Sequence, residues 1–211
     1  MPSSAPSDLT ARLIDRLCHD LAGSFQALSS GLELLAEADT EAVRGEALAL
    51  VGEAAAGQRM AVAYARRAFG SAPPETSSSE LEALARGQFE GRRASLDWGV
   101  APIALGPAGA RVLLNLVQIA MECLAAGGVA KVTARRDQAA TQIRIEASGP
   151  RAALRDDSRA GLAGEPLGGG LAGLWVQGAL VHALAIGVGG TVSVEAGDGM
   201  VRFSVDLPAG G

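Results

Sequence analysis

Residues 9–35 read LTARLIDRLCHDLAGSFQALSSGLELL, and this stretch indicates how the N-terminal part of the chain folds. Its large apolar side chains recur at spacings of four and three residues, which is the period of one face of an α-helix. These side chains are Leu9, Leu13, Leu17, Leu21, Phe25, Leu28, Leu32 and Leu35. The stretch therefore predicts one long helix with a continuous apolar stripe.

A second helix is predicted over residues 41–69. Asp39 or Thr40 suits its N-cap, because a short polar side chain there accepts a hydrogen bond from a free backbone amide. Gly70 suits the position just past its C-terminus. The face of this helix is rich in alanine, and small side chains let two helices approach closely. Residues 1–72 therefore predict an antiparallel helical hairpin as the first domain.

A two-helix hairpin buries only one side of each helix, so it is not a stable unit by itself. Two arrangements would cover its remaining apolar surface. A second copy of the chain would complete a dimeric four-helix bundle, or the hairpin would pack on its own second domain. We favour the dimeric bundle.

A second domain is predicted over residues 78–209, after a linker rich in serine and proline at 70–79. Its sequence alternates between helix and strand patterns, and Gly197-Asp198-Gly199 is a strong hairpin signal between the last two strands. Helices are expected near 81–88, 107–126 and 171–186, and strands near 95–100, 131–136, 142–147, 191–195 and 201–207. The pattern predicts a mainly antiparallel sheet with helices on one face, so the whole chain is expected to be α+β.

Composition and charge exclude several classes of function. A net charge of −5 argues against a nucleic-acid-binding protein, which needs a basic surface. The two cysteines, Cys18 and Cys123, and the two histidines, His19 and His182, show no metal-ligand spacing. No apolar run reaches the length that spans a bilayer, and residues 1–8 lack the pattern of a signal peptide. We therefore expect a cytoplasmic protein with no membrane partner and no metal.

His19 is the candidate chemical group of the first helix. At about 100° per residue it lies roughly 160° from Leu17 and from Leu21, so it is expected to face solvent. Asp20 follows it, and Arg16 precedes it by three residues on the same side of the helix. An imidazole between a carboxylate and a guanidinium suits phosphoryl transfer: the ring attacks phosphorus, and the carboxylate selects its tautomer. The His-Asp pair alone is more typical of an ordinary surface histidine with charged neighbours.

Three motifs together resemble the ChpT-type bacterial histidine phosphotransferases over nearly the whole chain. They are Arg-Leu-Cys-His-Asp-Leu at 16–21, Ser-Gly-Leu-Glu-Leu-Leu at 30–35 and Tyr-Ala-Arg-Arg-Ala-Phe-Gly at 64–70. Such proteins are similar to the core of a sensor histidine kinase, with a phosphotransfer hairpin joined to a degenerate ATPase-like domain. The resemblance implies that His19 accepts a phosphoryl group from an aspartyl phosphate on one receiver domain and donates it to another.

The resemblance also assigns supporting roles and shows departures. Asp20 would orient the imidazole, and Arg16 would contact the phosphoryl group or the receiver. Where the family usually has Ser-Pro and small residues after the histidine motif, and an Asn before the glycine of the second motif, this chain has Gly23, Ser24, Phe25 and Ser30. These changes are expected to affect the helix below the histidine and the choice of receiver, and to leave the chemistry in place.

The second domain resembles a kinase ATPase domain that has lost its nucleotide chemistry. Residues 114–120 are similar to the asparagine helix of sensor kinases, but Ile119 stands where a magnesium ligand belongs, and it has no oxygen to offer. Residues 146–151 are similar to the adenine-binding loop, but Ala147 replaces its aspartate and Arg151 replaces a glycine. We therefore expect that this domain binds no ATP and serves as a docking surface.

We interpret the other candidate residues of this domain as structural. Asn115, Gly149 and the glycines at 168–170, which resemble the last glycine box, are expected to serve packing and turns, although Asn115 would also fit a pocket rim. His182 lies on an apolar run and is expected to be a half-buried structural residue.

The combined hypothesis is a homodimeric phosphorelay intermediate. Its partners would be response-regulator receiver domains, including that of a hybrid histidine kinase. No cofactor is expected in this chain, and magnesium is expected on the receiver. Two alternatives remain at this point: an ATP-dependent sensor kinase core, and a non-catalytic dimeric scaffold that binds receivers.

Overall fold

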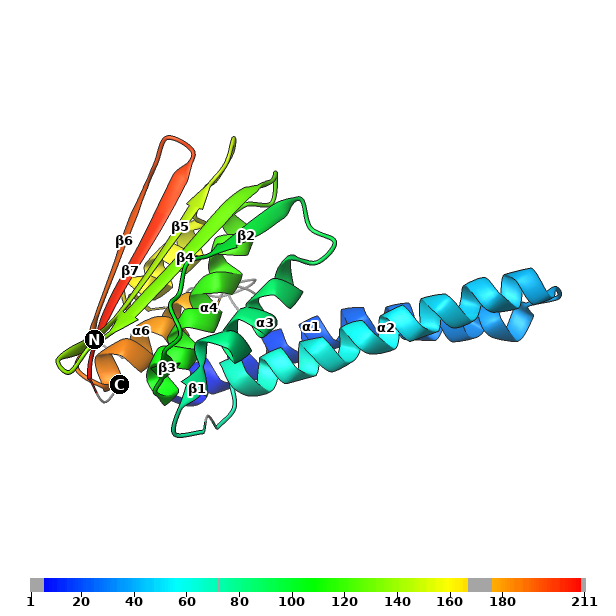
Figure 1. Ribbon diagram of the computed structural model, residues 1–211, viewed down its shortest axis with the longest axis horizontal. Coiled ribbons are helices and arrows are strands. Elements are labelled where there is room, and N and C mark those ends of the chain that lie inside the picture. Colours follow the sequence, from blue (N-terminus) through cyan, green and yellow to red (C-terminus); the bar gives the residue numbers. More distant parts are fainter. Residues whose placement is uncertain (1–5, 72, 167–175, 210–211) are drawn as a thin grey trace.

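A long helical hairpin projects from a unit of sheet and helices in the computed structural model, which describes residues 6–71, 73–166 and 176–209 (Figure 1). Helix α1 covers Pro6–Glu37 and helix α2 covers Glu41–Ala68. The Thr40 hydroxyl accepts a hydrogen bond from the Val43 amide at 3.3 Å, so Thr40 is the N-cap of α2. The two helices run antiparallel along each other, as the periodicity predicted.

The base of the hairpin packs on the second unit, and its far part does not. Tyr64 and Ala68, near the end of α2, belong to the hydrophobic core of the sheet-and-helix unit. Farther out, α1 and α2 cover only each other (Figure 1). Phe25 and Leu48 on this outer part are each 54% exposed. Packing on the chain's own second domain thus accounts for the base of the hairpin and leaves apolar side chains uncovered beyond it.

The second unit is built on a five-stranded sheet. Its strands are β2 (Ala94–Trp98), β4 (Gly128–Arg136), β5 (Ala140–Ser148), β7 (Met200–Pro208) and β6 (Thr191–Gly197), in that spatial order. β2 pairs with β4 in parallel, and the other pairs are antiparallel. Asp198 (φ 49°) and Gly199 (φ 72°) both have the left-handed backbone that a type I′ turn needs. They confirm the predicted hairpin between β6 and β7.

Helices cover one face of this sheet (Figure 1). They are α3 (Ser78–Phe89), α4 (Pro107–Cys123), the short α5 (Asp156–Leu162) and α6 (Gln177–Gly187), and two short strands, β1 (Thr76–Ser77) and β3 (Ala104–Leu105), pair beside them. Most side chains of α4 are buried, because α4 lies between the sheet and the base of the hairpin. The pattern did not predict α5, which is too short to show a helical period. The expected start of the last helix, at 171–175, lies outside the described residues.

Side chains of α4 hold the end of α2. The Asn115 amide donates to the carbonyl of Ala68 at 3.0 Å, and the Arg111 guanidinium donates to the carbonyl of Phe69 at 3.3 Å. The Tyr64 hydroxyl donates in the other direction, to the carbonyl of Leu114 at 2.6 Å. The last carbonyls of a helix lack partners within the helix, so the donors of Asn115 and Arg111 satisfy those at the end of α2. They also fix the position of the hairpin relative to α4, and therefore of His19.

Candidate functional site

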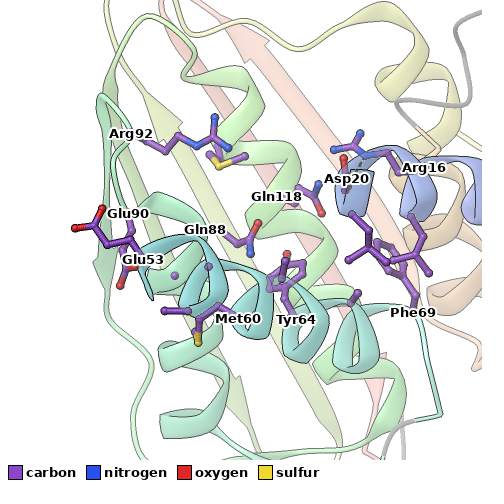
Figure 2. A pocket seen from close by; sticks show the side chains of 18 residues that line it. Arg16, Asp20, Glu53, Met60, Tyr64, Phe69, Gln88, Glu90, Arg92 and Gln118 are labelled. Carbon is purple, nitrogen blue, oxygen red and sulfur yellow. Dashed lines mark hydrogen bonds and ion pairs between the residues drawn. The ribbon is translucent and has the colours of Figure 1, made fainter. Parts of the chain in front are cut away.

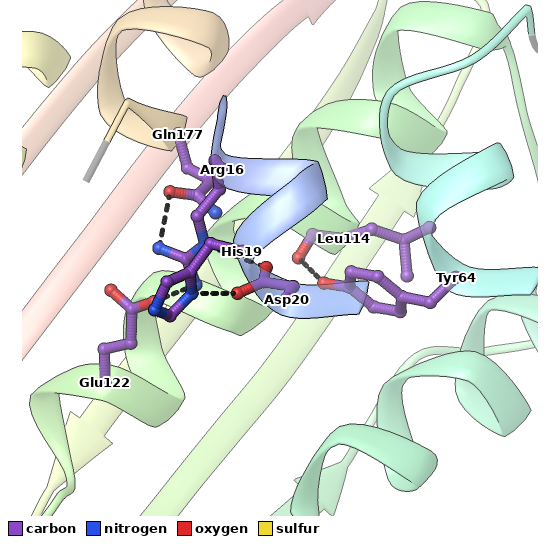
Figure 3. Close-up of polar contacts among 7 residues, drawn as sticks. All are labelled: Arg16, His19, Asp20, Tyr64, Leu114, Glu122 and Gln177. Atoms are coloured by element: carbon purple, nitrogen blue, oxygen red, sulfur yellow. Dashed lines mark hydrogen bonds and ion pairs between the residues drawn. The ribbon is translucent and has the colours of Figure 1, made fainter. Parts of the chain in front are cut away.

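His19 lies on the exposed side of α1, near the point where the hairpin meets the second unit (Figure 3). Its side chain is 66% exposed, so the ring is open to solvent. The ring Nδ1 lies 3.4 Å from Oδ1 of Asp20, and the side chain of Asp20 is 37% exposed. When Nδ1 carries the proton, it donates to this carboxylate, and the lone pair of Nε2 is free.

Arg16 holds the carboxylate of Asp20 in place through its other oxygen, Oδ2. Nε of Arg16 donates to Oδ2 of Asp20 at 2.8 Å. Residues four apart lie on the same face of a helix, so this ion pair forms within α1 without distortion. The carboxylate of Asp20 therefore stands between the Arg16 guanidinium and the His19 ring.

The predicted location of Arg16 is wrong. The sequence placed it on the exposed side with His19, ready to contact a phosphoryl group or a receiver, but the residue is only 8% exposed. Its Nη2 donates to Oε1 of Glu122 on α4 at 2.9 Å, and its Nη1 lies 3.4 Å from Oε1 of Gln177 at the start of α6 (Figure 3). The face of α1 that carries Arg16 is covered by the second unit, which the periodicity of α1 alone does not reveal.

Burial and charge act against each other in this cluster. Burial alone lowers the pKa of Arg16, but the charges of Glu122 and Asp20 outweigh it, and the pKa is raised overall. Burial raises the pKa of the Glu122 carboxyl above its ordinary value, and the positive charge of Arg16 opposes that rise. The guanidinium is thus firmly charged, and its charge favours the ionised form of Glu122.

Glu122 and Gln177 are members of the site that the sequence analysis missed. One signal was available for Glu122, which is the single acidic residue in the strongly apolar sequence of α4. An ionisable group in such a helix needs a partner, and Arg16 on another helix is that partner. Gln177 stands at the N-terminus of α6 and gave no comparable signal.

A hollow of about 550 Å³ adjoins the cluster, between the hairpin and helices α3 and α4 (Figure 2). Arg16 and Asp20 line one end of it, and Tyr64 and Gln118 also face it. Arg92 stands at the other end (Figure 2). Asp20, the neighbour of His19, therefore lies at the edge of a concave surface.

The residues compared with a kinase nucleotide site lie in the core or in a turn. Ile119 is 2% exposed and Ala147 is fully buried, and both belong to the hydrophobic core. Asn115 is fully buried and bonded to Ala68, so it holds α2. A Cβ at Gly149 would meet the backbone of Gly127 at 2.4 Å, so this glycine permits a close approach of two chain segments. Arg151 is exposed. The glycines at 168–170 lie outside the described residues.

The described residues show a structural contact for the second histidine, no cluster of metal ligands and no membrane-spanning helix. His182 is half-buried, and its Nδ1 lies 3.0 Å from the carbonyl oxygen of Leu162, which is a structural contact. Within residues 6–71, 73–166 and 176–209, no three His, Cys, Asp or Glu side chains gather where they would hold a metal. In the same part of the chain, no helix is both long and apolar enough to cross a bilayer.

Comparison with known proteins points to one family. Residues 78–199, more than half of the chain, match the family model described as the histidine phosphotransferase C-terminal domain. The protein phosphotransferase ChpT of Brucella abortus is 30% identical over 124 residues, which span 57% of this chain and 58% of that protein.

Solved structures agree on the fold. A bacterial phosphotransferase is 24% identical, with a TM-score of 0.84 over 97% of this chain and 98% of that one. A histidine kinase domain of the blue-light activated kinase of Erythrobacter litoralis is 12% identical, with a TM-score of 0.51 over 89% of this chain and 94% of that one. These two likenesses concern the fold alone, whereas the family model concerns the sequence. On that sequence match, the chain belongs to the histidine phosphotransferase family.

Proposed function

We propose that this chain is a phosphorelay intermediate that moves a phosphoryl group between aspartates of two receiver domains through His19, without ATP. One observation carries the proposal: the imidazole of His19 is exposed, with Nδ1 facing a carboxylate that is itself held by an arginine. Such a ring offers Nε2 outward as a nucleophile. Membership of the histidine phosphotransferase family supports the same chemistry.

The transfer step begins with the neutral ring. The lone pair of Nε2 on His19 attacks the phosphorus of an aspartyl phosphate, and the bond between phosphorus and the aspartyl oxygen breaks. The electron pair of that bond returns to the receiver's carboxylate. The phosphorylated ring keeps its proton on Nδ1 and is formally positive, so the negative charge of Asp20 stabilises it. The reverse step on a second receiver restores the neutral ring.

Charge on the phosphoryl oxygens is balanced mainly by the partner. A magnesium ion on the receiver would supply this balance, as it does in phosphoryl transfer generally. Arg16 is committed to Asp20 and Glu122, so in this proposal it positions Asp20 instead of contacting the phosphoryl group.

The proposal that transfer needs no ATP rests on two residues that stand where a sensor kinase would bind its nucleotide. Ile119 and Ala147 are aliphatic and lie in the core. Neither side chain has a ligand for magnesium or an acceptor for the adenine amino group. The second domain then serves to hold the hairpin and to dock partners. Its contacts with the base of α2, through Asn115 and Arg111, support this role.

The active unit in this proposal is a homodimer. Large apolar side chains remain exposed on the outer part of the hairpin: Phe25, Leu32, Leu34, Leu48 and Leu50 are between 41% and 54% exposed. A soluble chain seldom leaves this many large apolar side chains open to water. A second hairpin would cover those that share one side of this hairpin and complete a four-helix bundle. Receiver domains, including that of a hybrid histidine kinase, would then dock beside each His19.

Transfer between receivers tests the proposal. The full chain is mixed with a radiolabelled phosphorylated receiver domain, and then with an unlabelled second receiver. We expect label that is stable to base and labile to acid on the wild type, followed by its passage to the second receiver. His19→Ala should abolish both, and His182→Ala, which changes the other histidine, should abolish neither.

Other outcomes identify the other functions. Label that passes equally well with His19→Ala assigns the chemistry to a different residue. Receiver binding without any labelling of the wild type indicates a scaffold. Labelling of the isolated chain by radioactive ATP and magnesium indicates a kinase, which the proposal excludes.

A further inference from the structure

We propose that Glu122 of the second domain is a positioning residue for phosphotransfer, acting on His19 through Arg16 and Asp20. This inference rests on the proposed function of His19. It assigns the second domain a part in the chemistry itself, beyond holding the hairpin. The four side chains form one continuous series of polar contacts from α4 to the exposed ring (Figure 3).

The first reason lies in the geometry of neighbouring helix residues. His19 and Asp20 are adjacent, so their side chains leave α1 about 100° apart and do not face each other by default. The carboxylate of Asp20 reaches Nδ1 of His19, at 3.4 Å, only in a particular rotamer. Asp20 is 37% exposed, so water competes for the same carboxylate. Something must hold that rotamer for the pair to persist.

Arg16 does so, and its own position depends on α4. Nε of Arg16 binds Oδ2 of Asp20 at 2.8 Å, which turns Oδ1 toward His19. A long arginine side chain on an open helix surface would lose this orientation readily. Here the rigid guanidinium is clamped at a second nitrogen, because Nη2 binds Oε1 of Glu122 at 2.9 Å. The orientation of Asp20 is therefore set from the second domain.

Domain docking does not depend on Glu122 alone. Tyr64, Asn115 and Arg111 join α2 to α4 by separate hydrogen bonds. Arg67 of α2 also forms an ion pair with Glu80 of α3. This pair is separate from the contacts of Asp20 with Arg16 and His19. Removing Glu122 thus leaves these other contacts of the hairpin in place, and its hydrogen bond to the hairpin is the one with Arg16. Glu122 also interacts electrostatically with Arg155, which belongs to the second unit. Glu80 offers a matched control, because its loss breaks another ion pair between the two domains.

A double-mutant cycle measures the coupling between Glu122 and Asp20. The rate of label transfer from a saturating phosphorylated receiver to His19 is measured for wild type, Glu122→Ala, Asp20→Asn and the double variant. We expect Glu122→Ala to slow this step about tenfold, which corresponds to about 1.4 kcal/mol in the activation barrier. In the Asp20→Asn background it should cause no further slowing. The receiver concentration for half-maximal rate should stay unchanged.

Three further variants separate positioning from folding. Glu80→Gln should leave the rate unchanged. Glu122→Gln, which keeps an oxygen for Arg16 but loses the charge, should slow transfer less than Glu122→Ala and remains available when the alanine variant folds poorly. Arg16→Lys should transfer more slowly than the wild type although it keeps the positive charge. The reason is that an ammonium group has no fork that holds Asp20 and Glu122 together.

The nitrogen chemical shifts of the His19 ring provide a readout that needs no receiver. Wild type should show the proton on Nδ1, and Glu122→Ala should show a mixture of the two neutral forms. Unchanged shifts, an unchanged rate, or equal slowing with and without Asp20 would each overturn the role of Glu122. Failure of the wild type to take label is a different result, because it contradicts the proposed function of His19.

Discussion

Nη2 of Arg16 on α1 lies 2.9 Å from Oε1 of Glu122 on α4, and both side chains are mostly buried at the junction of the two domains. A buried ion pair of this kind adds little to stability, because taking both charges out of water costs about as much as their attraction returns. Its effect is on geometry. The pair fixes one end of the contacts that lead to His19.

The pH dependence of stability should reveal the cost of burying Glu122. Its pKa is raised in the folded protein, chiefly by burial. A carboxyl with a raised pKa binds its proton more tightly in the folded state than in the unfolded state. Its contribution to stability is therefore full below the unfolded pKa, about 4.3, and is lost as the pH rises through the folded value.

Glu122→Gln provides the reference for this measurement, because glutamine resembles the protonated acid. We expect the two proteins to have similar free energies of unfolding near pH 4, and the wild type to fall behind the variant as the pH rises toward 7. Urea denaturation at a series of pH values measures this. A wild type that gains on Glu122→Gln with rising pH contradicts the expected sign.

The two cysteines should differ sharply in reactivity. Cys18 is exposed next to His19, and Cys123 is buried at the end of α4, where burial raises the pKa of its thiol to about 12. Because the thiolate is the reactive form, one equivalent of a thiol reagent should react quickly at pH 8 in the folded protein. Cys18→Ser should remove that reaction.

The same labelling reports on the site. A bulky adduct on Cys18 stands beside the His19 ring and should block receiver docking, so phosphotransfer should fall with the extent of labelling. The small Cys18→Ser change should leave transfer intact. Rapid reaction of both thiols in the folded chain would disprove the burial of Cys123.

The outer part of the hairpin should control association of two chains. Leu32 on α1 is 49% exposed, and Leu48 on α2 is 54% exposed. Burying such a side chain fully contributes about 1.5–3 kcal/mol, so covering its exposed half contributes about half as much, and each substitution acts twice in a symmetric dimer. Leu32→Gln and Leu48→Gln should each weaken self-association at least about tenfold in sedimentation equilibrium.

Ile186 supplies the control for this prediction. It is 50% exposed on α6, away from the outer hairpin, so Ile186→Gln should leave self-association unchanged. Equal weakening by all three substitutions would indicate a different interface. A monomeric wild type at micromolar concentration would remove the four-helix bundle from the proposal.

The hydrogen bond from Tyr64 to Leu114, one of several between the hairpin and the second unit, should contribute to stability. The Tyr64 hydroxyl donates to the carbonyl of Leu114 at 2.6 Å, and the residue is 4% exposed. Tyr64→Phe leaves that carbonyl without this donor and should lower the free energy of unfolding by about 1 kcal/mol. Denaturant titration measures the change, and an unaltered midpoint would show that water replaces the hydroxyl.

Much of the secondary structure was predictable because it depends on local patterns. Apolar side chains every three or four residues predicted both hairpin helices, and the alternation near 131–136 and 142–147 predicted β4 and β5. Short elements such as α5 contain too few residues for any period to stand out. The parallel pairing of β2 with β4 also escaped prediction, because a strand pattern does not show which neighbour the strand will have.

The outward position of His19 and its neighbour Asp20 follow from the helical repeat, which is a local property of the backbone. The surroundings of Arg16 are not local. Whether that side chain meets water or α4 depends on where residues more than a hundred positions later in the chain come to lie, and the periodicity of α1 has no information on this. For that reason only the tertiary structure joined Glu122 to Arg16, buried the pair, and linked the second domain to His19.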